Sequence, residues 1–244
     1  MVAFLASDIG GFKKVDGKRI PVCLNAENGM IEQLKKYWKK DSRVLFLSAS
    51  PEDIESNDSH REAFEKAFPM SGLSISSMDV CDSRNEAVVS RIKEYDVLFL
   101  SGGHVPTQNA FFKKIGLGQA VADYEGIVMA LSAGSMNCAE TVYAIPEMEG
   151  EEKDITYQRF IKGLGLTKCM IIPHFQWIRN EVLGGLRVIE DIAVSDSMGN
   201  AFIALNDGSY ILSDNGSEKV YGEAYLIRDG SITKLCGNGE SVSL

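Results

Sequence analysis

The stretch GIVMALSAGS, residues 126–135, decides the fold, because an unbroken apolar run ends in four small residues. An apolar run without alternation is typical of a strand buried on both faces of a parallel sheet. The small residues predict a tight turn, and residues 136–141 can continue as a helix. A strand that leads through a turn into a helix is the repeating unit of an α/β protein.

Further apolar runs and helical patterns alternate along the chain. Runs typical of buried strands lie at residues 2–5, 44–47, 97–100 and 170–172. A more mixed run, residues 73–78, is typical of an edge strand, and helical periodicity covers residues 27–40, 61–68 and 85–94. This alternation predicts a mostly parallel sheet joined by right-handed crossovers.

The pattern changes in residues 201–244, where apolar runs are separated by Asn-Asp-Gly, Asp-Asn-Gly and Arg-Asp-Gly. Such turns need positive φ and are the strongest local signal for β-hairpins. We expect an antiparallel meander here. It is too short for a core of its own, so we expect it to extend one edge of the same sheet, which makes residues 1–244 a single domain.

Composition excludes several classes of protein. The chain has 34 acidic and 25 basic residues and a net charge of −9, so it repels a phosphate backbone and nucleic acid is not an expected partner. The five cysteines form no CxxC pair, which indicates a reducing compartment without disulfides. Because neither a signal peptide nor a membrane-length apolar run is present, we expect a cytoplasmic protein without membrane contact.

Ser132 lies where the strand turns into the helix, which is the setting of a nucleophile elbow. Small neighbours leave the serine Oγ exposed, and the next backbone N–H faces a developing oxyanion. Ala133 and Gly134 meet this need, whereas Ala130 replaces the first glycine of the usual GxSxG pattern. Ser135 is a competing nucleophile one turn into the helix, and a plain tight turn remains the alternative reading.

A second glycine turn, Ser101-Gly102-Gly103-His104, follows the strand at residues 97–100. The carboxyl ends of adjacent parallel strands face one crevice, so its N–H groups could supply a second oxyanion donor near Ser132. Read alone, the two glycines are more often just a turn. The turn matches neither the Rossmann fingerprint nor the Walker loop.

The chain has only three histidines, so the search for a general base is short. We interpret His60 as a surface residue in a polar segment, and the acidic stretch at residues 147–152 as a solvated loop. His174 directly follows an apolar strand and is the better base. Asp207 follows the strand 201–205 and could orient His174, although turn chemistry alone favours a hairpin role.

Four segments in this order resemble the peptidase E (aspartyl dipeptidase) and cyanophycinase family of serine peptidases. They are residues 101–104, 131–135, 172–175 and 204–209. The resemblance implies a three-layer α/β sandwich related to class I glutamine amidotransferases, with serine in place of their cysteine nucleophile. It implies a triad of Ser132, His174 and Asp207, oxyanion donors on Gly103 and Ala133, and no metal or cofactor.

Two departures from the family pattern concern the substrate. The glycine turn continues with His104, which places an imidazole beside Gly102 near the expected substrate pocket. Aspartyl dipeptidases use an arginine to bind the substrate carboxylate, and here the candidates are Arg179 and Arg187. Arg187 is the better candidate, because residues 186–192 are predicted to be helical and precede the strand that leads to Asp207. A surface arginine is an equal alternative.

The leading hypothesis is therefore a serine exopeptidase that hydrolyses short peptides through an acyl-enzyme, with N-terminal aspartyl dipeptides as implied substrates. The alternatives are a cyanophycinase-like hydrolase of β-aspartyl peptides and a non-catalytic binding module on the same fold. Apolar edge strands in the C-terminal meander would allow a homo-oligomer.

Overall fold

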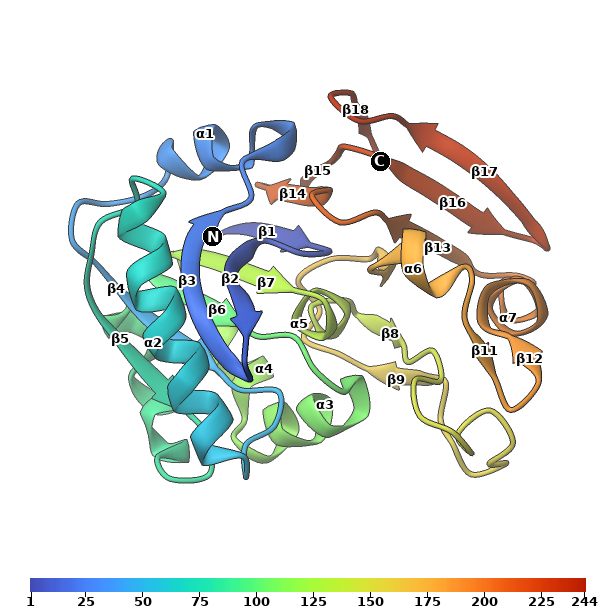
Figure 1. Cartoon of the computed structure of the whole chain (residues 1–244), viewed down its shortest axis with the longest axis horizontal. Helices are drawn as coiled ribbons and strands as arrows, with labels where there is room; N and C mark the ends of the chain where they lie inside the picture. The colour runs from blue at the N-terminus through green and yellow to red at the C-terminus, as the bar shows by residue number, and fades with distance from the viewer.

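An eight-stranded sheet forms the middle of the molecule in the computed structural model, which describes residues 1–244 (Figure 1). The strand order is β18-β15-β14-β1-β7-β6-β4-β5. Strands β1, β7, β6, β4 and β5 pair in parallel, and β14, β15 and β18 continue the sheet in antiparallel fashion. The bounds are β1 (Val2–Ala6), β4 (Ser42–Leu47), β5 (Ile75–Cys81), β6 (Val97–Leu100), β7 (Ile127–Leu131), β14 (Tyr210–Asp214), β15 (Ser217–Tyr221) and β18 (Ser241–Ser243).

The unbroken apolar runs of the sequence are explained by burial of the sheet on both faces. Along β6, Leu98 and Leu100 enter one core, whereas Val97 and Phe99 enter the other. Helices α1 (Met30–Lys35) and α2 (Ile54–Met70) cover the second face. The 3-10 helix η2 (Glu86–Glu94) and helices α3 (Val105–Lys114) and α4 (Leu117–Val121) cover the first. The predicted α/β architecture of three layers is confirmed, with a central sheet that is mostly parallel in its first half.

The C-terminal strands do not form one meander on one edge, as predicted, but divide between two sheets. Strands β14, β15 and β18 extend the main sheet, while β13 (Ala201–Leu205), β16 (Ala224–Arg228) and β17 (Ser231–Cys236) form a second sheet with β10 (Met170–Ile172). Ile203 and Ile211 lie in the same core, so the division buries apolar faces of both sheets against each other. The strand at residues 170–172 therefore belongs to the second sheet, where it pairs in parallel with β13.

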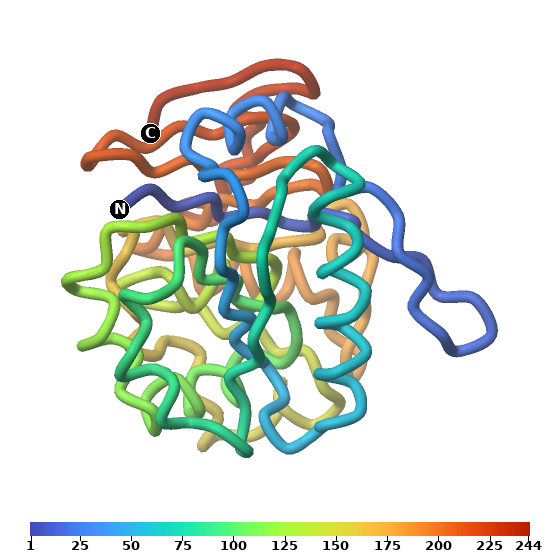
Figure 2. The backbone as a smooth tube through the Cα atoms, turned by 90° about the vertical axis from the view of Figure 1, so that its left-hand side faces the viewer, coloured from blue at the N-terminus to red at the C-terminus, as the bar shows by residue number.

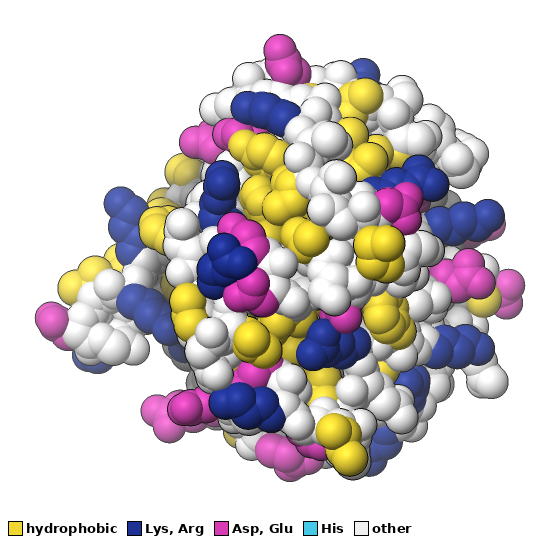
Figure 3. Space-filling view, turned by 90° about the vertical axis from the view of Figure 1, so that its right-hand side faces the viewer, with side chains coloured by type: hydrophobic (Ala, Val, Ile, Leu, Met, Phe, Trp, Pro, Cys, Tyr) yellow, Lys and Arg dark blue, Asp and Glu magenta, His cyan; other side chains and the backbone are white.

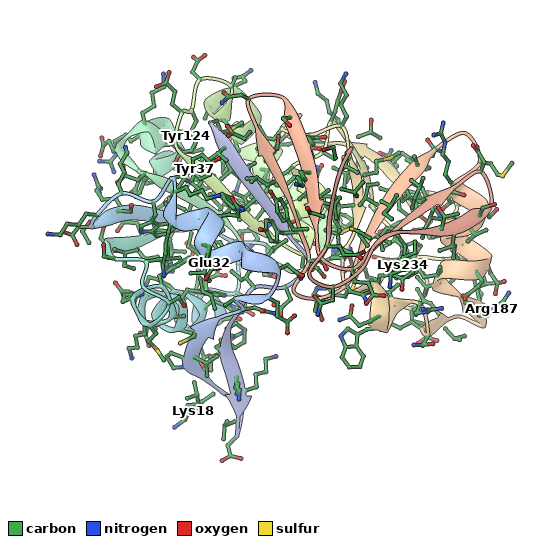
Figure 4. All side chains as sticks on the ribbon, turned by 90° about the horizontal axis from the view of Figure 1, so that it is seen from above. Lys18, Glu32, Tyr37, Tyr124, Arg187 and Lys234 are labelled. Atoms are coloured by element: carbon green, nitrogen blue, oxygen red, sulfur yellow. The ribbon has the colours of Figure 1, made fainter.

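A hairpin of β2 (Gly10–Val15) and β3 (Lys18–Leu24) was not expected, because lysines and arginines interrupt its apolar pattern. It projects from the body, and Lys18 lies at its tip (Figures 2 and 4). Asp16 and Gly17 between the strands have φ of 48° and 76°, so the Asp-Gly turn signal was present in the sequence. Two shorter hairpins are β8 (Thr141–Tyr143) with β9 (Phe160–Lys162), and β11 (Val182–Leu183) with β12 (Leu186–Arg187).

Three predicted helices differ from the structure. The helix expected over residues 136–141 is instead α5 (Ala133–Asn137), which ends before β8. The helix expected over residues 27–40 is reduced to η1 (Glu27–Gly29) and α1, because Asn28 and Gly29 adopt positive φ of 55° and 72°. Residues 186–192 are not one helix but the end of β12 and a π-helical segment, η3 (Val188–Ala193), which continues into α7 (Val194–Asp196). No helix combines the length and apolarity that crossing a bilayer requires.

Some apolar side chains reach the surface on the side of the molecule that carries β11, β12 and α7. Figure 3 shows them gathered in patches between acidic and basic side chains. Val182 and Met198 are 61% and 65% exposed.

Candidate active site

Ser132 lies in a strained turn between β7 and the short helix α5 (Ala133–Asn137), with φ of 50° and ψ of −119°. Such backbone geometry in a non-glycine residue persists where the surrounding structure enforces it, and it is typical of nucleophile elbows. A Cβ atom on Gly134 would lie 2.5 Å from the carbonyl oxygen of Leu100, so only glycine fits there. Ser135 is fully buried and donates its hydroxyl to the carbonyl of Ala6 at 2.7 Å. Its hydroxyl is therefore held in a buried hydrogen bond, and Ser132 is the accessible serine.

His174 joins Ser132 to Asp207. It follows β10 and begins helix α6 (Phe175–Ile178), and its own backbone has a left-handed φ of 54°. Its Nε2 lies 3.0 Å from Ser132 Oγ, and its Nδ1 lies 2.6 Å from Asp207 Oδ1. Since a carboxylate only accepts hydrogen bonds, Nδ1–H donates to Asp207 and Nε2 is left to accept the serine O–H. This tautomer is the one that a general base needs.

Asp207 is held in the turn between β13 and β14 by three neighbours besides His174. Its Oδ1 accepts from Ser7 Oγ at 2.8 Å, and its Oδ2 accepts from Trp177 Nε1 at 3.0 Å. Its backbone N–H donates to Gln176 Oε1 at 3.0 Å. The predicted hairpin role of Asp207 is wrong, because β13 and β14 belong to different sheets and do not pair, and its side chain faces His174.

Ser7 is a site residue that the sequence analysis missed. It is fully buried at the end of β1, donates to Asp207, and accepts the backbone N–H of His174 at 2.7 Å. It therefore fixes both members of the His174–Asp207 pair. A signal was present, since Ser7 is the first polar residue after an apolar strand. The same kind of position singled out Ser132 and His174.

The electrostatics of the pair favour an ionised Asp207 and a protonatable His174. Burial lowers the pKa of His174, but the hydrogen bond and negative charge of Asp207 more than offset it, so the pKa of His174 is raised above its usual 6.5. Burial raises the pKa of Asp207, and the His174 and Ser7 contacts reverse this, so the net pKa of Asp207 is lowered. Near neutral pH the carboxylate stays charged while His174 titrates.

We expect kcat/KM to fall about tenfold per pH unit on the acid side of the His174 pKa, because only neutral Nε2 can accept the serine proton. Since that pKa is raised, the fall begins above 6.5 and continues as pH decreases. A pH profile of kcat/KM on any hydrolysed peptide checks this. A flat profile from about pH 5 to 8 would contradict a role for His174 as base.

The glycine turn between β6 and α3 packs directly against Ser132. A Cβ on Gly102 would lie 3.1 Å from Ser132 Cβ and 2.6 Å from Leu131 Cδ1. The backbone N–H groups of Gly103 and Ala133 donate no hydrogen bond within the protein. Two unengaged N–H groups on the two turns beside a serine are what an oxyanion hole requires.

Two cavities of about 360 Å³ each open on the Ser132–His174 pair. We call them the hairpin cavity and the glutamate cavity. The hairpin cavity lies between the glycine turn, β2 and α2, and its other lining side chains include Asp8, Phe12, His60 and Phe64. The glutamate cavity lies toward α6, and its lining includes Met136, Ile145, Glu147, Trp177 and Glu181.

Comparison with known proteins gives the family. The model described as peptidase family S51 matches residues 24–220. The chain belongs to peptidase family S51. This family of serine-type peptidases includes peptidase E and cyanophycinase, so the resemblance seen in the sequence is confirmed.

Solved structures show the same fold for this S51 peptidase. A peptidase from an acI-B1 Actinobacterium has a TM-score of 0.66 and 16% identity, covering 100% of this chain and 96% of that one. A Listeria monocytogenes EGD-e protein named as a candidate peptidase E has a TM-score of 0.53 and 14% identity, covering 96% and 97%. No curated protein matches the chain.

His60 of the S51 chain is not the surface residue that we predicted. It lies on α2, lines the hairpin cavity, and packs between Phe12 and Phe46 at centroid distances of 5.4 and 6.2 Å. Burial and the nearby Arg19 lower the pKa of His60 to about 4, so it is neutral at pH 7. The unexpected β2–β3 hairpin covers this part of α2, which explains the error.

His104 does not line either cavity of the S51 site, contrary to the expectation that it contacts substrate. Its Nε2 lies 2.9 Å from Glu151 Oε1 and its Nδ1 lies 2.7 Å from Thr107 Oγ1. The acidic stretch predicted as a solvated loop is exposed over residues 147–150, but Glu151 and Glu152 turn toward the protein. Glu151 also accepts the backbone N–H groups of Glu147 and Met148, and its contact with His104 links the stretch to the start of α3.

Neither predicted arginine reaches the site. Arg187 is exposed and pairs with Asp191 at 2.5 Å, and Figure 4 shows it at the outer edge of the molecule. Arg179 lies over the Phe175 ring at 5.5 Å, and it too is exposed. No arginine or lysine lines the hairpin cavity or the glutamate cavity. No three His, Cys, Asp or Glu side chains are clustered to hold a metal ion.

Proposed function

We propose that this S51 chain hydrolyses short peptides through an acyl-enzyme, with Ser132 as nucleophile, His174 as general base and acid, and Asp207 as the residue that orients His174. The observation that carries the proposal is the continuous chain of contacts from Ser132 Oγ to His174 Nε2 at 3.0 Å and from Nδ1 to Asp207 Oδ1 at 2.6 Å.

The chemistry follows from these contacts. Ser132 Oγ attacks the scissile carbonyl carbon while its proton passes to His174 Nε2. The carbonyl oxygen becomes an oxyanion that accepts hydrogen bonds from the N–H groups of Gly103 and Ala133. His174 then gives the proton to the leaving amine as the C–N bond breaks. A water molecule, deprotonated by His174, attacks the acyl-enzyme, and the released Ser132 recovers its proton.

The size of the site supports short substrates. Each cavity of about 360 Å³ is small, near the lower end of the range for pockets that hold one small ligand. An exopeptidase that accommodates one residue on each side of Ser132 is consistent with this size. A preference for N-terminal aspartyl residues would call for a cation in one cavity, and the lining of neither supplies it.

Hydrolysis of a dipeptide panel with Asp, Glu, Asn, Leu and Lys at the N-terminus tests the proposal. We expect free amino acids to appear from at least one member of the panel, in a reaction that a serine-directed fluorophosphonate stops. Hydrolysis that persists after stoichiometric labelling of Ser132 would contradict the acyl-enzyme. Absence of hydrolysis across the panel, together with absence of labelling, would favour a non-catalytic binding module.

A further inference from the structure

The glutamate cavity has a composition of its own. Its walls are apolar and include Ile145, Ile178 and Val188, while its only acidic side chains are Glu147 and Glu181. Trp177 adds an indole ring that is 65% exposed and fixed by its hydrogen bond to Asp207. Apolar walls with an aromatic face and carboxylates suit a long aliphatic chain that ends in a positive charge.

Both carboxylates lack a partner of their own. Neither Glu147 nor Glu181 forms a salt bridge or a side-chain hydrogen bond, although nearby Glu151 is bonded to His104. Both side chains are exposed to solvent where they line the cavity. A cation bound here would reduce the repulsion between the two negative charges.

The cavity is also part of the substrate site and not a separate acidic surface. Ser132 and His174 are among its lining residues, and the unengaged N–H group of Ala133 follows Ser132 in the chain. Any peptide placed for attack by Ser132 Oγ therefore has a neighbouring side chain within reach of this cavity. The arginines that would favour an acidic side chain, Arg179 and Arg187, are directed elsewhere.

We propose that the glutamate cavity binds a basic side chain, that of lysine or arginine, next to the scissile bond. The inference rests on the proposed peptidase function and names its substrate class. Glu147 and Glu181 bind the ammonium or guanidinium group, and the apolar walls and Trp177 contact the aliphatic stem. Ion pairs of exposed carboxylates are each worth about 0.2–1 kcal/mol, which corresponds to roughly 1.4- to 5-fold in affinity.

Matched peptides test the inference. Lysine and its uncharged analogue norleucine are placed on either side of the scissile bond, in Lys-Ala, Nle-Ala, Ala-Lys and Ala-Nle, with Asp-Ala added. We expect the lysine peptide to exceed its norleucine partner at least about fivefold in kcat/KM at one of the two positions. The double variant Glu147→Gln/Glu181→Gln should reduce this ratio to below about twofold.

Glutamates outside the cavity provide the control. Glu149 lies in the same loop and Glu190 lies on η3, and neither lines the cavity, so Glu149→Gln/Glu190→Gln makes the same change of charge without touching the site. We expect this control to keep the wild-type ratio. An equal loss in both double variants would mean a long-range charge effect and would overturn the proposal.

Binding separates this inference from the proposed function. Calorimetric titration of the Ser132→Ala protein with the same peptides measures preference without turnover. If the wild type cleaves no peptide but this variant prefers lysine over norleucine, the cavity assignment stands and the peptidase proposal fails. If peptides are cleaved and bound with a lysine-to-norleucine ratio near one, or if Asp-Ala is preferred, the cavity assignment is wrong.

Discussion

Replacement of Ser132 by alanine is expected to lower kcat by about a millionfold, the loss found when the serine of an unrelated triad is removed. The reason is structural, because no other hydroxyl can take its place. Ser132 Oγ is 3.0 Å from His174 Nε2, whereas the Ser135 hydroxyl is buried against Ala6. Steady-state hydrolysis and intact-mass detection of fluorophosphonate labelling measure the loss.

Ser135→Ala is the matched control, since it removes a hydroxyl three residues away. Its buried hydrogen bond to the carbonyl of Ala6 contributes to stability, so we expect a loss of about 1 kcal/mol in the free energy of unfolding. Fluorophosphonate should still label this variant at Ser132. Labelling at Ser135, or full activity of Ser132→Ala, would show that the nucleophile is assigned wrongly.

Asp207→Asn is expected to lower kcat by about ten-thousandfold while the fold remains intact. The carboxylate holds the proton on Nδ1 at 2.6 Å and so leaves Nε2 free to accept from Ser132. An amide keeps one oxygen, but its NH₂ group can donate to the imidazole and stabilise the tautomer that cannot act as base. The Ser7 and Trp177 donors, at 2.8 and 3.0 Å, also lose the charged acceptor.

Asp214→Asn controls for a general effect of losing one carboxylate near β14. Asp214 accepts a hydrogen bond from Tyr37 at 2.9 Å and lines neither cavity. We expect kcat of this variant within about twofold of the wild type, because a surface carboxylate acts weakly on a distant site. If Asp207→Asn were to lose less than tenfold in kcat, Asp207 would have no orienting role.

Much of the main sheet could be predicted from local sequence. The runs at residues 2–5, 44–47, 97–100 and 127–131 lie within strands β1, β4, β6 and β7, because burial on both faces leaves a signature that needs no knowledge of neighbours. Because the carboxyl ends of adjacent parallel strands face one crevice, the sequence also placed Ser132 and the glycine turn at the same edge of the sheet. The joint position of His174 and Asp207 came from the resemblance as well, since turn chemistry alone favoured a hairpin role for Asp207.

The remaining features depend on pairings between distant segments. The turn residues after β13 would be the same whether β13 paired with β14 or with β10. The packing of the two sheets against each other decides between these pairings. His60 was misread because only the folded β2–β3 hairpin covers it. The assignment of Arg187 to substrate failed because Asp191, four residues later, neutralises it locally.

The division of the C-terminal strands between two sheets has a consequence for how turnover can be tuned. Ser132 follows β7 of the main sheet, whereas His174 and Asp207 follow β10 and β13, adjacent strands of the second sheet. The Ser132–His174 contact therefore joins the two sheets, and Ser7, which follows β1 of the main sheet, also binds Asp207 and the backbone of His174. We therefore expect substitutions in the core shared by the two sheets to change the alignment of nucleophile and base. Every residue of the triad stays in place in such variants.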